Sequence, residues 1–154
     1  THPPGQAPTY ETLHPAITQL NANAASIPSN GGDSTLGRIV LTIGQTTYQT
    51  ISNGNIAYQP PVAPAPLIIP QGTSAAMIAE LRRNHDDEKA AFNKYNAVDA
   101  ALKKQILDAT ESTYITSLKN RTTGFARVTT RQIIEHLYNN YGRITVKTLT
   151  ENKT

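Results

Sequence analysis

The stretch GFARVTTRQIIEHLYNNYG, residues 124–142, contains the start, the buried stripe and the end of one amphipathic helix. Thr129 and Gln132 have the spacing of a capping box, in which two residues satisfy each other's backbone N–H groups at a helix start. Apolar residues then recur every four positions, and a glycine follows as the residue expected just beyond the helix. The predicted stripe is Ile133, Leu137 and Tyr141, with Ile134 and Tyr138 beside it, and the closing glycine is Gly142.

The segment before this helix carries a longer helical pattern. Apolar side chains recur at steps of three and four residues from Met77 to Ile106, which predicts a long amphipathic helix that begins at a Thr73 or Ser74 cap. A shorter helix is predicted over residues 111–119. Residues 73–154 therefore form the predicted helical bundle domain.

The N-terminal part, residues 1–57, has weaker signals. Pro15 suits the first turn of a helix, where its missing N–H is no loss, and Pro28 ends that helix. In LGRIVLTIGQTTYQTI, residues 36–51, alternating apolar residues predict a short strand, whereas residues 45–51 also fit a short helix. The fold class predicted for the whole chain is mainly α, with an irregular N-terminal half.

A proline-rich segment, residues 58–72, separates these two parts. Its sequence YQPPVAPAPLIIPQG contains five prolines and predicts an extended, polyproline-like conformation. We call this segment the strap. Its apolar anchor is predicted at Leu67, Ile68 and Ile69.

The positive charge is concentrated in the last third of the chain. Residues 102–154 carry nine bases and four acids, a net charge of +5, whereas the remainder carries −2. Such a segment attracts nucleic acid, but solvated helix faces explain the charges better, because Phe125 is the only aromatic residue closely interleaved with them. The candidate nucleic-acid contacts are Lys103, Lys104, Lys119, Arg121, Arg127 and Arg131, and Arg131 also has the i, i+4 spacing for an ion pair with Glu135 in water.

Catalytic and metal-binding signals are weak. The cluster RRNHDDEK, residues 82–89, brings His85 next to three carboxylates, but consecutive residues on a helix point about 100° apart and cannot converge on one ion. The chain has no cysteine, phosphate-binding glycine loop or nucleophile-elbow motif. We therefore expect no enzyme, cofactor, metal site or small-molecule substrate.

Two other features bear on compartment. No apolar run approaches the roughly 18 residues that a membrane span requires, so no membrane partner is expected. Asn120 and Asn152 each begin a glycosylation sequon, which matters only for a secreted protein.

Three segments resemble the Gag polyprotein of copia-type LTR retrotransposons, around the N-terminal part of its capsid. They are APTYETLHPAITQLNANAASIPSNGG, LGRIVLTIGQTTYQTI, and the helical block from residue 91 to residue 145, which contains GFARVTT and LYNNYG. The second segment has Arg38 where the family has a histidine, and no zinc knuckle follows.

The resemblance implies a capsid-like helical bundle and a structural protein that assembles with itself into particles or filaments, in a retrotransposon or as a domesticated relative. The predicted assembly residues are Leu67, Ile68, Ile69, Tyr138 and Asn139. Two alternatives remain open at this point: an extracellular fibre or surface protein of the same fold, and a nucleic-acid-binding module that contacts RNA. A Gag-like protein would be a cytoplasmic particle, and a fibre protein would be extracellular.

Overall fold

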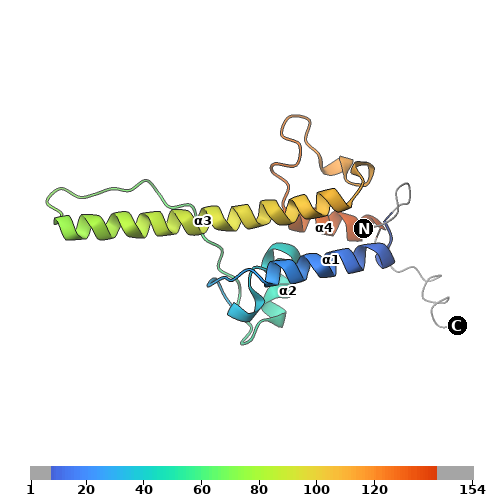
Figure 1. The fold of residues 1–154 in the computed structure, drawn as a ribbon, viewed down its shortest axis with the longest axis horizontal. Helices are drawn as coiled ribbons and strands as arrows, with labels where there is room; N and C mark the ends of the chain where they lie inside the picture. The colour runs from blue at the N-terminus through green and yellow to red at the C-terminus, as the bar shows by residue number, and fades with distance from the viewer. Residues whose placement is uncertain (1–7, 142–154) are drawn as a thin grey trace.

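The computed structural model describes residues 8–141, and this part of the chain is mainly helical (Figure 1). The described range contains no β-strand, only an isolated antiparallel bridge between Asn120 and Gly124. The predicted fold class is therefore confirmed. The helices are α1 (Tyr10–Ala25), α2 (Val40–Ile51), α3 (Ala75–Ala109) and α4 (Thr130–Tyr141), with 3-10 turns at Ser34–Leu36, Ser112–Tyr114 and Thr116–Leu118.

The four helices share one hydrophobic core. Helix α1 packs against α2, α3 and α4, and α4 also packs against α2 and α3. The strap therefore connects two parts of the chain that contribute to the same core. The buried apolar residues include Leu13, Ile17 and Leu20 from α1, Val40, Leu41 and Tyr48 from α2, Val98, Leu102 and Ile106 from α3, and Ile133, Ile134 and Leu137 from α4.

Helix α1 begins earlier than the sequence predicts. Thr9 and Thr12 cap it: the Thr9 N–H donates to the Thr12 hydroxyl at 2.9 Å, and that hydroxyl donates to the Thr9 carbonyl at 3.0 Å. Pro15 consequently lies inside the helix rather than in its first turn, and that prediction is wrong. Pro15 is exposed, so its ring faces away from the core.

The predicted strand at residues 36–51 is also wrong, because this segment forms α2. The helix alternative for residues 45–51 is confirmed. Val40, Leu41 and Thr42 are buried in succession, so the alternating pattern does not mark two different faces. Gly44 interrupts the helix with φ of 82°, and a Cβ there would lie 3.2 Å from Nε of Arg131. A residue without a side chain is needed at this close approach.

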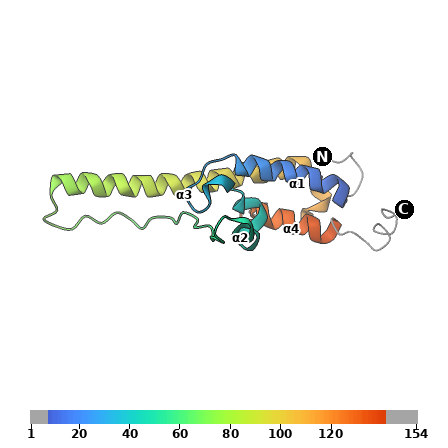
Figure 2. The same ribbon diagram turned by 90° about the horizontal axis from the view of Figure 1, so that it is seen from below.

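Helix α3 begins at the predicted cap, where the Ser74 hydroxyl accepts a hydrogen bond from the Met77 N–H. At 35 residues it is roughly 52 Å long, and its buried residues all lie in the last third, from Val98 onward. The first two thirds extend beyond the other helices, with the strap running back alongside (Figures 1 and 2). We call the strap together with residues 75–97 the arm.

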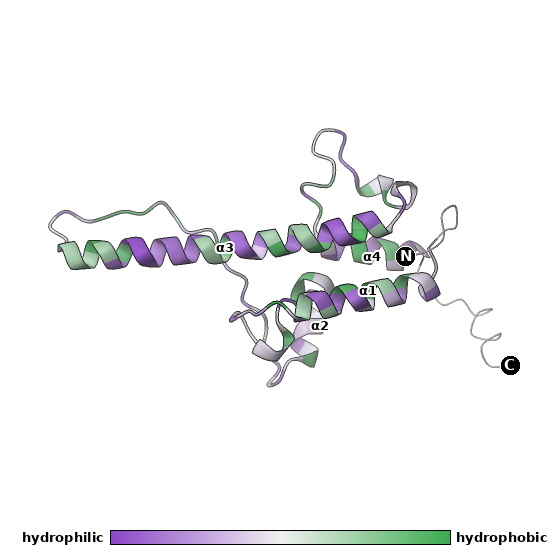
Figure 3. Ribbon diagram, viewed as in Figure 1, coloured by the Kyte–Doolittle hydropathy of each residue, from purple (hydrophilic) through white to green (hydrophobic). Residues whose placement is uncertain are grey.

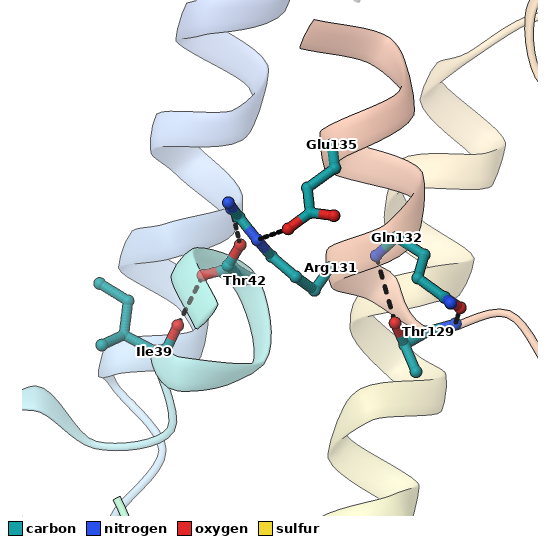
Figure 4. Close-up of polar contacts among 6 residues, drawn as sticks. All are labelled: Ile39, Thr42, Thr129, Arg131, Gln132 and Glu135. Atoms are coloured by element: carbon teal, nitrogen blue, oxygen red, sulfur yellow. Dashed lines mark hydrogen bonds and ion pairs between the residues drawn. The ribbon is translucent and has the colours of Figure 1, made fainter. Parts of the chain in front are cut away.

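Helix α4 has the predicted capping box. The Thr129 N–H donates to Oε1 of Gln132 at 2.9 Å, and the Gln132 N–H donates to the Thr129 hydroxyl at 3.2 Å (Figure 4). Ile133, Ile134 and Leu137 are buried and Tyr141 is partly buried, while Gly142 lies outside the described residues.

The helix predicted over residues 111–119 forms two 3-10 turns instead. Ser and Thr side chains compete for backbone hydrogen bonds and weaken a regular helix. Here the Thr116 hydroxyl donates to the Ser112 carbonyl at 2.6 Å. Ile115 between the two turns is still buried in the core.

Candidate assembly surface

The arm carries most of the exposed large apolar side chains of residues 8–141, while Ile51 and Ile56 lie outside it. Ile68 is 82% exposed and Val62 78%, and Leu67 and Met77 are also exposed, whereas Ile69 is half-buried. The predicted anchor at Leu67, Ile68 and Ile69 thus lies near the free end of the arm. It does not pack into the core of its own chain.

The strap lies against one face of α3. Shallow grooves between them are lined on the helix side by Leu81, His85 and Phe92 and on the strap side by Pro64 and Pro66. Nε2 of His85 lies 3.1 Å from the Ala65 carbonyl oxygen, within hydrogen-bonding distance. His85 therefore contacts the strap, and the described residues contain no group of three metal-ligating side chains.

The end of the arm is a tight turn. The Thr73 N–H donates to the Pro70 carbonyl at 3.3 Å, and Gly72 has φ of 84°. Glycine adopts this conformation without steric cost. The turn reverses the chain from the strap into the Ser74 cap of α3.

The other end of the strap is fixed to the core by Tyr58. Its ring lies 5.4 Å from that of Tyr48 and 6.1 Å from that of Tyr95. Gln45 donates to the Tyr58 carbonyl at 2.8 Å and accepts from the Tyr58 N–H at 3.1 Å. Burial raises the pKa of Tyr95. The arm therefore has a well-packed root and an exposed end.

Charge is absent from a long part of this surface. No Asp, Glu, Lys or Arg occurs between Arg38 and Glu80, a range that covers α2, the strap and the first turn of α3. Burying such a surface against a partner desolvates no ionised side chain of this segment. The strap is thus chemically suited to an apolar contact.

The two residues of the second predicted contact, Tyr138 and Asn139, have different surroundings in the structure. Tyr138 lies against α1, with its ring 6.3 Å from that of Tyr10 and its hydroxyl 3.4 Å from Nδ1 of His14. Burial raises the pKa of Tyr138. Asn139 is exposed. Tyr138 therefore already helps to hold α4 against α1.

Three of the six candidate nucleic-acid residues are engaged in internal contacts. Nζ of Lys103 donates to the Phe125 carbonyl at 2.9 Å, and Lys104 forms an ion pair with Asp108 at 2.9 Å. Arg131 pairs with Glu135, as predicted, but it also donates to the Thr42 carbonyl at 2.9 Å and so links α4 to α2 (Figure 4). Lys104 is nevertheless exposed, as are Lys119, Arg121 and Arg127.

The two sequons differ in what the structure shows. The Asn120 side chain accepts hydrogen bonds from the N–H groups of Thr122 at 2.8 Å and Thr123 at 3.0 Å. This local bonding fixes a turn. Asn120 is exposed, and Asn152 lies outside the described residues.

A cluster of polar contacts around Asp33, at the end of the arm that joins the core, was not predicted from the sequence. The Asp33 carboxylate accepts from the Thr35 hydroxyl at 2.6 Å and from the Asn53 N–H at 2.8 Å, and the Asp33 N–H donates to the Tyr48 hydroxyl at 2.8 Å. The hydrogen bond from Thr35, followed by those from backbone N–H groups, lowers the pKa of Asp33. The signal available in the sequence was an aspartate two residues before a threonine in a glycine-rich loop, a common turn motif.

Arg38 is only 6% exposed, which the sequence does not predict for a charged residue. Within residues 8–141, its Nε and one terminal guanidinium nitrogen are buried without a hydrogen-bond partner. Buried charges are normally paired because their desolvation is costly. We therefore expect this buried charge to lower the stability of the fold.

Comparison with known proteins identifies no relative: no protein-family model, no curated protein and no solved structure matches this chain. None of the helices in the described range combines the length and the apolar character needed to cross a membrane.

Proposed function

We propose that this protein is a structural, self-assembling subunit of the Gag-like capsid type, whose main partner is another copy of itself. The observation that carries the proposal is the arm. A long helix and an uncharged strap extend beyond the core and keep Ile68, Val62 and Met77 in water. Particles or filaments are the expected products of such repeated contacts.

Exposed apolar side chains on an extended element favour association. Each square ångström of apolar surface removed from water contributes roughly 25 cal/mol, and larger exposed apolar patches typically mark interaction sites. A helix also gains most of its stability from packing rather than from its own hydrogen bonds. The arm therefore gains stability when a second surface covers it.

The groove between α1 and α3 favours a structural role, whereas titratable side chains such as Tyr95, Asp99 and Arg131 line another groove of the described residues. The groove between α1 and α3, about 370 Å³, is lined by aliphatic, proline and amide side chains such as Leu20, Pro15 and Gln105. An active site is expected to place titratable groups together in a cleft. This groove has none in its lining.

The test measures association of the purified chain over a wide concentration range by light scattering, with electron microscopy of the products. We expect particles or filaments for the unaltered chain and a clear loss of assembly for Ile68→Asp. Thr47→Asp, at an exposed position of α2, is the matched control and should assemble normally. A chain that stays monomeric at every concentration would overturn the proposal.

A further inference from the structure

The face of α3 that points away from the strap has no partner in the described structure. Residues 76, 79, 83, 86, 90 and 97 are spaced by three and four, or by seven, and all are exposed. This is the spacing with which two helices pack side by side. Leu81, His85 and Phe92, which line the grooves against the strap, lie on the opposite face.

The centre of this free face carries opposite charges. Arg83 and Asp86 occupy successive positions of the stripe, with Arg82 and Asp87 next to them. On either side lie the small residues Ala79 and Ala90, which allow close approach of a second helix. Figure 3 shows the hydrophilic band in this part of α3 and the more hydrophobic end of the arm beyond it.

These charges are not used inside the chain. Arg82–Asp86 and Arg83–Asp87 have the i, i+4 spacing of a helix ion pair, yet neither pair forms. The ion pairs found within residues 8–141 are Lys104–Asp108 and Arg131–Glu135, which have the same spacing. These two arginines and two aspartates of the arm are thus available for a partner.

We propose that two copies of this chain pair through their arms, with the two α3 helices antiparallel and the two-fold axis between positions 84 and 85. In this register Arg83 of each copy faces Asp86 of the other, and Ala79 of each faces Ala90 of the other. A parallel pair in register would instead place Arg83 on Arg83 and Asp86 on Asp86. The charge pattern therefore selects a second copy in the antiparallel orientation.

The antiparallel pair leaves the strap side of each arm free for further contacts. An antiparallel pair about this axis places the end of each arm alongside the root of the other arm. Val62 and Ile68, on the strap side of each arm, stay exposed outside the pair, where further copies can cover them. The arm–arm pair is thus a dimeric unit of the proposed assembly, and this inference rests on the proposed function.

Charge reversal tests the pairing. Arg83→Glu alone and Asp86→Arg alone should each weaken association about tenfold or more, because two symmetry-related attractions become repulsions. A mixture of the two variants should restore association, since every facing pair is then opposite in charge. An effect confined to one helix is not restored by mixing.

Cysteine substitution tests the orientation, and the absence of native cysteine keeps the readout clean. Ala79→Cys mixed with Ala90→Cys should give a disulfide-linked dimer under mild oxidation, while neither variant gives one alone. Thr47→Cys mixed with Ala90→Cys is the control for random collision. Cross-links in each single variant alone would mean parallel pairing and would overturn the inference.

The outcomes separate the two proposals. If the unaltered chain assembles while the charge variants assemble equally well and the cysteine mixture gives no cross-link, the antiparallel arm pair is wrong and self-assembly stands. If the unaltered chain stays monomeric in light scattering, both proposals fail.

Discussion

Helix α3 is buried in the core at one end and exposed in the arm at the other. Comparing the two ends separates the residues that stabilise the fold from those that are available to a partner. In its last third, Val98, Leu102 and Ile106 are buried where α3 packs against α1 and α4. In the arm, only the strap covers the helix, and Met77 remains 47% exposed. The same regular backbone therefore serves as a core element at one end and as a contact surface at the other.

The largest expected difference between the two regions comes from truncating one large apolar side chain in each. Leu102 is 2% exposed, so Leu102→Ala should lower the free energy of unfolding by about 2–5 kcal/mol. Met77→Ala in the same helix should change it by less than about 0.5 kcal/mol at concentrations where the chain is monomeric. Chemical denaturation of both variants measures this, and equal losses would contradict the division into core and arm.

A second difference concerns where charge is placed. The core encloses the partly unpaired guanidinium of Arg38, while the strap is uncharged and exposed. Arg38→Met keeps much of the apolar volume and removes the desolvated charge, so we expect about 1–3 kcal/mol of added stability. Thermal unfolding at one fixed concentration measures the gain. A loss of stability would show that the Arg38 guanidinium makes contacts that stabilise the core.

Local signals in the sequence predicted much of the helical framework. The capping box at Thr129 and Gln132 and the cap at Ser74 act over a few residues, and both are confirmed. The first residue of α1, and whether residues 40–51 form a helix or a strand, could not be predicted from local signals alone. Thr9 and Thr12 start α1 before Pro15, and burial on several sides of α2 produces an alternating pattern without a strand.

The candidate surface was predictable only in part. The apolar triplet of the strap could be recognised from composition, whereas its position at the end of a projecting arm depends on how far α3 extends beyond the core. The basic residues could be found by counting, but the contacts of Lys103 with Phe125 and of Arg131 with Thr42 depend on the tertiary fold. The nucleic-acid surface therefore stays a prediction, with Lys103 and Arg131 also holding the fold together.

The smallest expected effect lies at the root of the arm, where Asp33 joins the loop before α2 to the residues after it. Because hydrogen bonds to the carboxylate lower the pKa of Asp33 in the folded chain, the ionised form favours folding. This contribution is complete above the ordinary carboxyl pKa and is lost as the pH falls from there through the lowered folded pKa.

Asp33→Asn keeps the acceptor oxygen for Thr35 but replaces the oxygen that accepts from the Asn53 N–H with an NH2 group, so it removes the charge together with that hydrogen bond. We expect the variant to unfold at slightly lower denaturant concentration than the unaltered chain at pH 7, and at the same concentration once the pH is well below the carboxyl range. A difference that persists unchanged in acid would assign the effect to packing. Because Asn53 directly follows the residues that end α2, loss of this contact should loosen the start of the strap before it affects the helices. Hydrogen exchange at the backbone amides of residues 53–58, compared with those of α4, distinguishes local loosening from global unfolding.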